Sequence, residues 1–121
     1  MFKKLECVCM HTNDIGKSLA FYTSMGLTEN WRIERTLEDG SIWSVIGLKF
    51  PRQDSSELVL SNHPVNQFTE VEILVDDVRQ AHAELSNNRE IQWIRTPFAT
   101  ESGHVAVMEA PDGNVVVLVG K

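Results

Sequence analysis

Apolar residues recur at helical spacing in the segment that follows Asp14. Ile15, Leu19 and Tyr22 occupy positions i, i+4 and i+7, which places them on one face of a helix. Asp14 is a residue type that commonly caps the N-terminus of a helix, and Gly26 is the type that commonly follows a C-terminus. The pattern therefore predicts a helix that begins after Asp14 and ends before Gly26.

A second helix is predicted after Asp76 and Asp77, with Val78, His82 and Leu85 on one face. Short runs rich in Val, Ile, Leu and aromatic residues, each bounded by turn signals, predict strands between and beyond the helices. These strands are expected at residues 4–11, 27–36, 41–49, 57–61, 68–75, 91–96, 103–109 and 115–119.

The predicted elements repeat along the chain, since Asp14 recurs as Asp77 at a spacing of 63 residues. Each half has the order strand, helix, strand, strand, strand. The predicted fold class is therefore α+β, with two βαβββ units at residues 4–61 and 68–119 of a single domain that spans residues 1–121. Duplicated units of this size bury their apolar faces against each other. A cleft between two such units is a common place for a ligand.

Composition narrows the possible partners of the chain. Of its 121 residues, 42% are hydrophobic and 23% are charged, which is ordinary for a globular domain. Eleven Lys and Arg residues against 17 Asp and Glu residues give a net charge of −6. This sign argues against nucleic acid and against anionic membrane surfaces as partners. The sequence also lacks the apolar segment of a signal peptide and any run long enough to cross a membrane.

Cys7 and Cys9 are the two cysteines, and they lie two apart in a predicted strand. Their side chains then share one strand face about 7 Å apart, which is too far for an unstrained disulfide. Both are expected to be reduced thiols, and a cytoplasmic location is expected.

Several motifs resemble those of a known family. Residues 14–22 together with residues 25–27 resemble the D-L-x-x-S-x-x-F-Y-x-x-L-G signature of the vicinal oxygen chelate superfamily. Residues 75–78 resemble its V-D-D-V motif, and residues 110–114 resemble its D-P-D-G-N turn. The superfamily contains glyoxalase I, bleomycin resistance proteins, fosfomycin resistance enzymes and extradiol dioxygenases. The resemblance implies two sheets that form an incomplete barrel around a cleft, and it implies a homodimer, because members commonly pair.

The enzymes of that superfamily resemble one another in a metal site whose ligands face the cleft. The resemblance places ligand positions at Cys7, Glu70 and Val117, and the internal symmetry adds Val59. Valine cannot bind a metal, and a thiolate with a carboxylate suits no common catalytic metal well. Glu57 lies two residues before Val59, on the same strand face. We therefore expect no metal and no cofactor, with a divalent metal held by atypical ligands as the alternative.

Candidate ligand-binding residues follow from the same strand faces. Cys7 and Cys9 either form a cleft wall with a reactive thiol or pack as small apolar residues in a sheet core. Glu70 and Glu72 share the face of one strand, where glutamate is disfavoured unless it is paired. They are read either as a ligand-binding or general-base site, or as an exposed face or structural ion pair.

Trp43 is the tryptophan expected to stack on a flat ligand, with core packing as the alternative for any of the three tryptophans. His104 is placed either at the cleft mouth or on the surface. The predicted function is metal-independent binding of a small organic molecule, similar to that of bleomycin resistance proteins. The alternatives are a metal-dependent lyase, isomerase or dioxygenase, and a structural or regulatory scaffold. The predicted ligand-binding residues are Cys7, Cys9, Trp43, Glu57, Glu70, Glu72 and His104.

Overall fold

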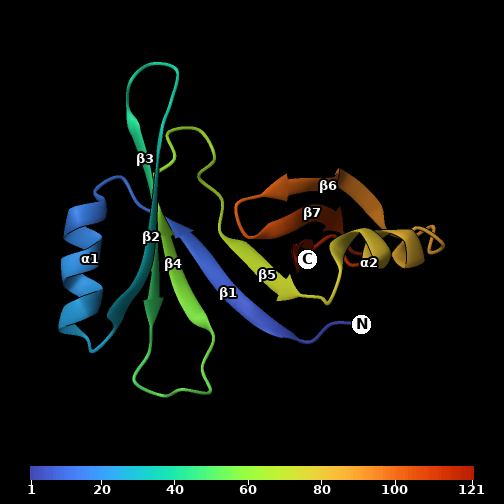
Figure 1. Ribbon diagram of the computed structural model, residues 1–121, viewed down its shortest axis with the longest axis horizontal. Coiled ribbons are helices and arrows are strands. Elements are labelled where there is room, and N and C mark those ends of the chain that lie inside the picture. Colours follow the sequence, from blue (N-terminus) through green and yellow to red (C-terminus); the bar gives the residue numbers. More distant parts are fainter. The chain divides into compact units, whose positions relative to one another are not determined.

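The computed structural model describes residues 1–121, and its elements run in the order expected from the sequence (Figure 1). The α+β class and the two βαβββ units are confirmed. Neither helix is long and apolar enough to cross a membrane. The elements are β1 (Lys4–His11), α1 (Ile15–Ser24), β2 (Thr28–Thr36), β3 (Ile42–Lys49), β4 (Glu57–Ser61), β5 (Glu70–Leu74), α2 (Val78–Leu85), β6 (Gln92–Thr100), β7 (Gly103–Glu109) and β8 (Val115–Gly120).

The chain forms two compact units. The N-terminal unit is Cys7–Thr69, and the C-terminal unit is Glu70–Lys121 together with Met1–Glu6. The sequence repeat placed residues 4–6 with the first unit instead. The structure groups the start of the chain with the second unit because the backbone N–H of Lys3 donates to the carbonyl oxygen of Leu74 at 2.8 Å.

The N-terminal unit has the strand order β2-β3-β4-β1, in which β1 and β4 are parallel and the other neighbours are antiparallel. Helix α1 covers one face of this sheet, where Leu19 and Tyr22 pack against the buried side chains of Ile46, Leu48 and Leu60. These two helix residues belong to the apolar stripe predicted from the sequence.

Two local interactions fix where α1 begins and ends. The Asp14 carboxylate accepts the backbone N–H of Lys17 at 3.0 Å, as the capping pattern predicted. Gly26 has a φ of 105°, a backbone conformation that other residues rarely adopt, so the chain turns away from the helix there.

The C-terminal unit has the strand order β5-β8-β7-β6. Val78 and Ala81 of α2 pack on Ala106, Met108 and Leu118, and all five side chains are buried. Each unit therefore has a sheet with one face covered by its own helix and a second face that the helix leaves uncovered.

Strand β6 is longer than the sequence predicted. It was expected at residues 91–96 but runs from Gln92 to Thr100, through Pro97. Proline is tolerated because β6 lies at the edge of its sheet, and the pairing shifts register between Arg95 and Phe98, around Pro97.

Candidate functional site

The face of the N-terminal sheet away from α1 carries most of the predicted site residues. Successive side chains on a strand point to opposite faces. Because Leu58 and Leu60 of β4 pack toward α1, their neighbours Glu57, Val59 and Ser61 point to the other face. We call this the helix-free face. Strand pairing adds residues from β1, β2 and β3, so the face comprises Cys7, Cys9, Trp31, Ile33, Arg35, Trp43, Val45, Gly47, Glu57, Val59 and Ser61.

Cys7 and Cys9 form a buried cluster with Val59 at the centre of this face. Trp31 and Val45 pack against the cluster from the side, and no disulfide joins the two cysteines. The cysteines therefore act as small apolar residues in the floor of the face, which is the packing role that the sequence left open.

Glu57 stands beside this cluster and is held by two neighbours on β2. The indole Nε1–H of Trp31 donates to Glu57 Oε1 at 2.8 Å, and the amide Nδ2–H of Asn30 donates to Glu57 Oε2 at 2.7 Å. The Trp31 ring lies directly on Gly47, where a Cβ atom would stand 2.1 Å from two atoms of the indole. Only glycine at position 47 allows Trp31 to lie in this way.

Trp43 occupies a second polar and aromatic cluster on the same face. Its indole Nε1–H donates to Ser61 Oγ at 2.9 Å. The guanidinium carbon of Arg35 lies 4.5 Å from the Trp43 ring centroid, and the His63 ring meets it edge-on at 4.7 Å. The ring is thus fixed by its contacts on several sides and presents a rigid surface.

The C-terminal unit carries the other two predicted carboxylates on β5. Ile73 packs toward α2, so Glu70 and Glu72 point to the helix-free face of this sheet, and Val117 of β8 pairs with Glu72 there. Burial raises the pKa of the Glu70 carboxyl above its ordinary value. No hydrogen bond or ion pair offsets this burial at Glu70, so it is a half-buried carboxylate without a partner.

His104 lies on the opposite face of the C-terminal sheet. It shares one face of β7 with Ala106 and Met108, which belong to the core beneath α2. The Nδ1 atom of His104 is buried without a hydrogen-bond partner. His104 therefore does not share a face with the carboxylates Glu70 and Glu72, although the sequence grouped it with them as a ligand-binding residue.

The residues at the expected ligand positions do not fit a divalent metal. Val59 and Val117 are buried at 3% and 6% exposure and offer no donor atom. Both oxygens of Glu57 accept hydrogen bonds from neighbouring side chains. No group of three or more His, Cys, Asp or Glu side chains is arranged to hold a metal ion. A catalytic metal needs about three protein ligands, which this arrangement does not supply.

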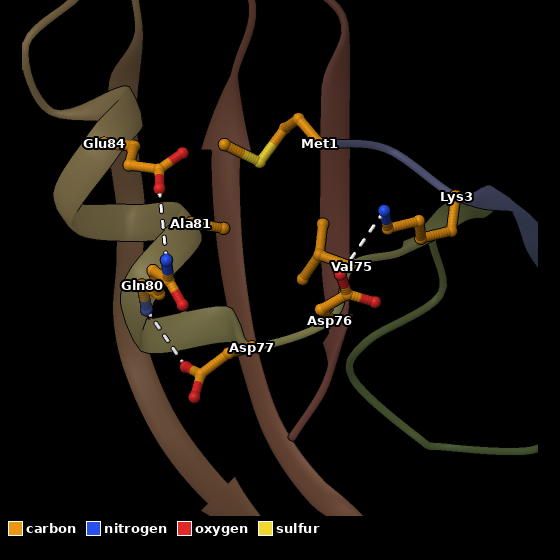
Figure 2. A pocket seen from close by; sticks show the side chains of 8 residues that line it. All are labelled: Met1, Lys3, Val75, Asp76, Asp77, Gln80, Ala81 and Glu84. Atoms are coloured by element: carbon orange, nitrogen blue, oxygen red, sulfur yellow. Dashed lines mark hydrogen bonds and ion pairs between the residues drawn. The ribbon is translucent and has the colours of Figure 1, made fainter.

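A cavity of about 220 Å³ lies in the C-terminal unit, beside α2 (Figure 2). Its polar groups already partner one another: Lys3 pairs with Asp76 at 3.3 Å, and the Gln80 amide donates to Glu84 at 3.3 Å. None of the predicted site residues lines it. The cavity is lined by Met1, Lys3, Val75, Asp76, Asp77, Gln80, Ala81 and Glu84.

Sequence reasoning missed the neighbours that hold Glu57. Asn30 was given no role, and Trp31 was weighed only as one of three tryptophans. One signal was present: Gly47 interrupts an otherwise apolar strand, and an isolated glycine in a strand often marks a close approach of another group. The partner of that approach depends on strand pairing, which the sequence alone did not supply.

Comparison with solved structures gives matches over nearly the whole chain. A methylmalonyl-CoA epimerase matches with a TM-score of 0.75 and 17% identity, covering 98% of this chain and 94% of that one. A variant of the Streptomyces coelicolor methylmalonyl-CoA epimerase, in complex with 2-nitronate-propionyl-CoA, matches with a TM-score of 0.74 and 13% identity, covering 100% and 96%. A catechol 2,3-dioxygenase matches with a TM-score of 0.63 and 13% identity, covering 96% of this chain and 42% of that one.

No protein-family model and no curated protein matches the sequence. The epimerase and the dioxygenase are members of the vicinal oxygen chelate superfamily. At these identities the likeness concerns the fold and carries no activity, since one fold hosts many functions. The chain has the fold of the vicinal oxygen chelate superfamily, as its motifs indicated.

Proposed function

We propose that this protein binds a small organic molecule without a metal, in the manner of a bleomycin resistance protein. The observation that carries the proposal is Glu70, a half-buried carboxylate with no partner at a position that the family resemblance assigns to a metal ligand. Burying a carboxylate is costly unless it gains a hydrogen bond. A ligand that donates to Glu70 would offset that cost.

Two of the positions where a metal ligand was expected hold valine, and this supports ligand binding without a metal. Val59 and Val117 make part of each helix-free face apolar, which favours contact with the carbon skeleton of a ligand. Trp43 adds a rigid aromatic surface in the N-terminal unit. Within the N-terminal unit, Trp43 suits a flat apolar group, and within the C-terminal unit, Glu70 suits a hydrogen-bond-donating group.

Two measurements test this proposal. Elemental analysis of the purified protein should find no stoichiometric divalent metal, and a thermal-shift screen of small organic molecules should find stabilising ligands. Glu70→Gln should weaken the binding of such a ligand by about 1–3 kcal/mol, the scale of a hydrogen bond to a charged group. The matched control is Glu90→Gln, which removes the same charge from an exposed turn. Metal at one equivalent per chain that is lost in Glu70→Gln would overturn the proposal.

A second candidate function is proton transfer, which the raised pKa of Glu70 favours. A carboxyl group with a raised pKa accepts a proton from a carbon acid more readily than an ordinary one. Lyases and isomerases use such a base. Turnover of a bound ligand that is abolished in Glu70→Gln, with binding retained, would favour this function over binding alone.

We also propose that the protein is a cytoplasmic homodimer. The reduced, buried cysteines support the location, because disulfides are rare in that compartment. Strands β2 and β6 are edge strands, and pairing of chains is one way to protect such edges. The remaining alternative is a scaffold protein that dimerises without binding a ligand. The thermal-shift screen distinguishes it from a ligand-binding protein, because a scaffold would not be stabilised by small molecules.

A further inference from the structure

The Glu57 carboxylate is bound only by neutral groups. Its two oxygens accept one hydrogen bond each, from Trp31 and from Asn30. Both donors are uncharged, and no ion pair reaches Glu57. A carboxylate has room for about four hydrogen bonds, so the carboxylate retains capacity to accept more. The side chain is half-buried, where its charge is poorly compensated by water.

The backbone of β2 departs from regular geometry to make this arrangement. Neighbouring residues on a strand normally point to opposite faces, so Asn30 and Trp31 should not reach the same carboxylate. The pairing of β2 with β3 shifts register between Glu29 and Trp31, which inserts Asn30 as an extra residue. This bulge turns both side chains toward Glu57. Bulges are frequent next to binding and active sites, where they re-aim side chains.

The Trp31 ring is fixed beside the carboxylate. Gly47 leaves space for the ring beneath it, and Cys7, Cys9 and Val59 pack against it. The indole is therefore positioned before any ligand arrives. The face of an indole attracts cations within about 6 Å of its centre.

A cation on the neighbouring strand β3 does not form an ion pair with Glu57. Lys49 ends β3, where it pairs with Thr28 of β2, and its side chain is exposed. It forms no ion pair with Glu57. The chain as a whole carries a net charge of −6, which attracts cationic solutes.

We propose that Glu57 and Trp31 form a subsite for an organic ammonium group, in which the ammonium donates to Glu57 and lies against the indole. A cation that hydrogen-bonds to Glu57 is within reach of the ring, because the two side chains touch at 2.8 Å. This subsite deepens the proposed function and rests on it: a small molecule bound by the N-terminal unit would be a cationic amine with an attached apolar group. The charge-assisted hydrogen bond would replace water, and Trp31 would supply a cation–π contact.

The test uses benzylammonium chloride as the probe and benzyl alcohol as its neutral match, with ¹⁵N-labelled full-length protein at neutral pH. The resonance of the Trp31 indole N–H is assigned by its disappearance in Trp31→Phe. Benzylammonium should shift this resonance in a saturable way, whereas benzyl alcohol at the same concentration should not.

Three variants separate the charge of Glu57 from general electrostatics. Glu57→Gln keeps an oxygen that can accept from Trp31 and should weaken benzylammonium binding at least about tenfold. Glu34→Gln removes the same charge from an exposed position on β2 and should leave binding unchanged. Lys49→Gln removes a competing cation and should raise the affinity by up to about fivefold. This last variant decides the matter even if Glu57→Gln does not fold.

Four outcomes would each overturn the ammonium subsite. Two concern the probes: equal shifts with benzyl alcohol, or no shift with benzylammonium at tens of millimolar. Two concern the variants: undiminished benzylammonium binding in Glu57→Gln, or weaker binding in Lys49→Gln. The thermal-shift screen distinguishes this failure from failure of the proposed function, because uncharged ligands that stabilise the protein through Glu70 would leave the binding function standing.

Discussion

Gly47→Ala should test the packing of the helix-free face more directly than any other single substitution. An alanine Cβ at this position would stand 2.1 Å from both Cε2 and Nε1 of Trp31. Carbon atoms do not approach closer than about 3.5 Å without repulsion. Gly47 lies in regular strand geometry, so the backbone itself accepts alanine. The whole effect must therefore come from the displacement of Trp31.

The expected loss of stability follows from that displacement. A ring that moves by more than an ångström loses its 2.8 Å hydrogen bond to Glu57, which costs about 1 kcal/mol at a half-exposed site. Overpacking against the cysteine cluster costs about 1–3 kcal/mol. Replacing a strand glycine with alanine gives back about 0.5–1 kcal/mol through reduced chain entropy. The net change should be a loss of about 2 kcal/mol in the free energy of unfolding.

Urea unfolding followed by far-ultraviolet circular dichroism measures this change without relying on tryptophan fluorescence. Gly16→Ala is the matched control, because a Cβ there meets no atom closer than 3.8 Å and alanine favours a helix. A double-mutant cycle assigns the cause. In a Trp31→Ala background Gly47→Ala should instead stabilise the protein by about 0.5–1 kcal/mol, giving a coupling of about 3 kcal/mol. Additive effects would refute the reasoning, since they would mean that Trp31 does not lie on Gly47.

Three further predictions concern other parts of the chain. Burial raises the pKa of Glu70, so the folded state binds the carboxyl proton more tightly than the unfolded chain does. The free energy of unfolding should therefore fall as pH rises from the ordinary glutamate range through the folded pKa. A pH series of melting curves should show this fall in the unaltered protein and not in Glu70→Gln. His63→Ala should speed amide hydrogen exchange at Val65 and Asn66, because the imidazole Nδ1 accepts both backbone N–H groups, at 3.1 and 2.9 Å; unchanged exchange would contradict this role. Analytical ultracentrifugation at tens of micromolar should find a two-chain species, and a single monomer-sized boundary would count against the homodimer.

The fold was predictable because its signals are local. Each signal depends on residues close in sequence: the capping carboxylate of Asp14, the apolar stripe that follows it, and the turn glycines. Because the pattern repeats along the chain, the two halves support the same assignment of elements. The extension of β6 was missed for the opposite reason. Pro97 normally ends a strand, and its tolerance depends on β6 lying at the edge of the sheet, which is a property of the assembled fold.

The site was predictable only in part. Strand alternation correctly grouped Cys7 with Cys9 on one face, and it grouped Glu70 with Glu72 on another. It could not tell that His104 faces the core beneath α2, since that depends on which side of β7 the helix covers. Nor could it find the contact between Trp31 and Glu57, which are 26 residues apart and meet only because of a bulge.

The two carboxylates at the centre of the proposals differ in how the fold holds them. Two hydrogen-bond donors fix the Glu57 carboxylate, and one of them belongs to the Trp31 ring, which is itself held in place, so the geometry is set before a ligand binds. Glu70 has no such support, and its burial leaves it dependent on whatever group approaches it. A preorganised group recognises a partner of defined shape and charge, because little ordering remains to be done on binding. A carboxylate without donors instead accepts any hydrogen-bond donor or proton that arrives. In the N-terminal unit, ligand specificity should therefore reside at Glu57 and Trp31, whereas in the C-terminal unit any proton transfer should reside at Glu70.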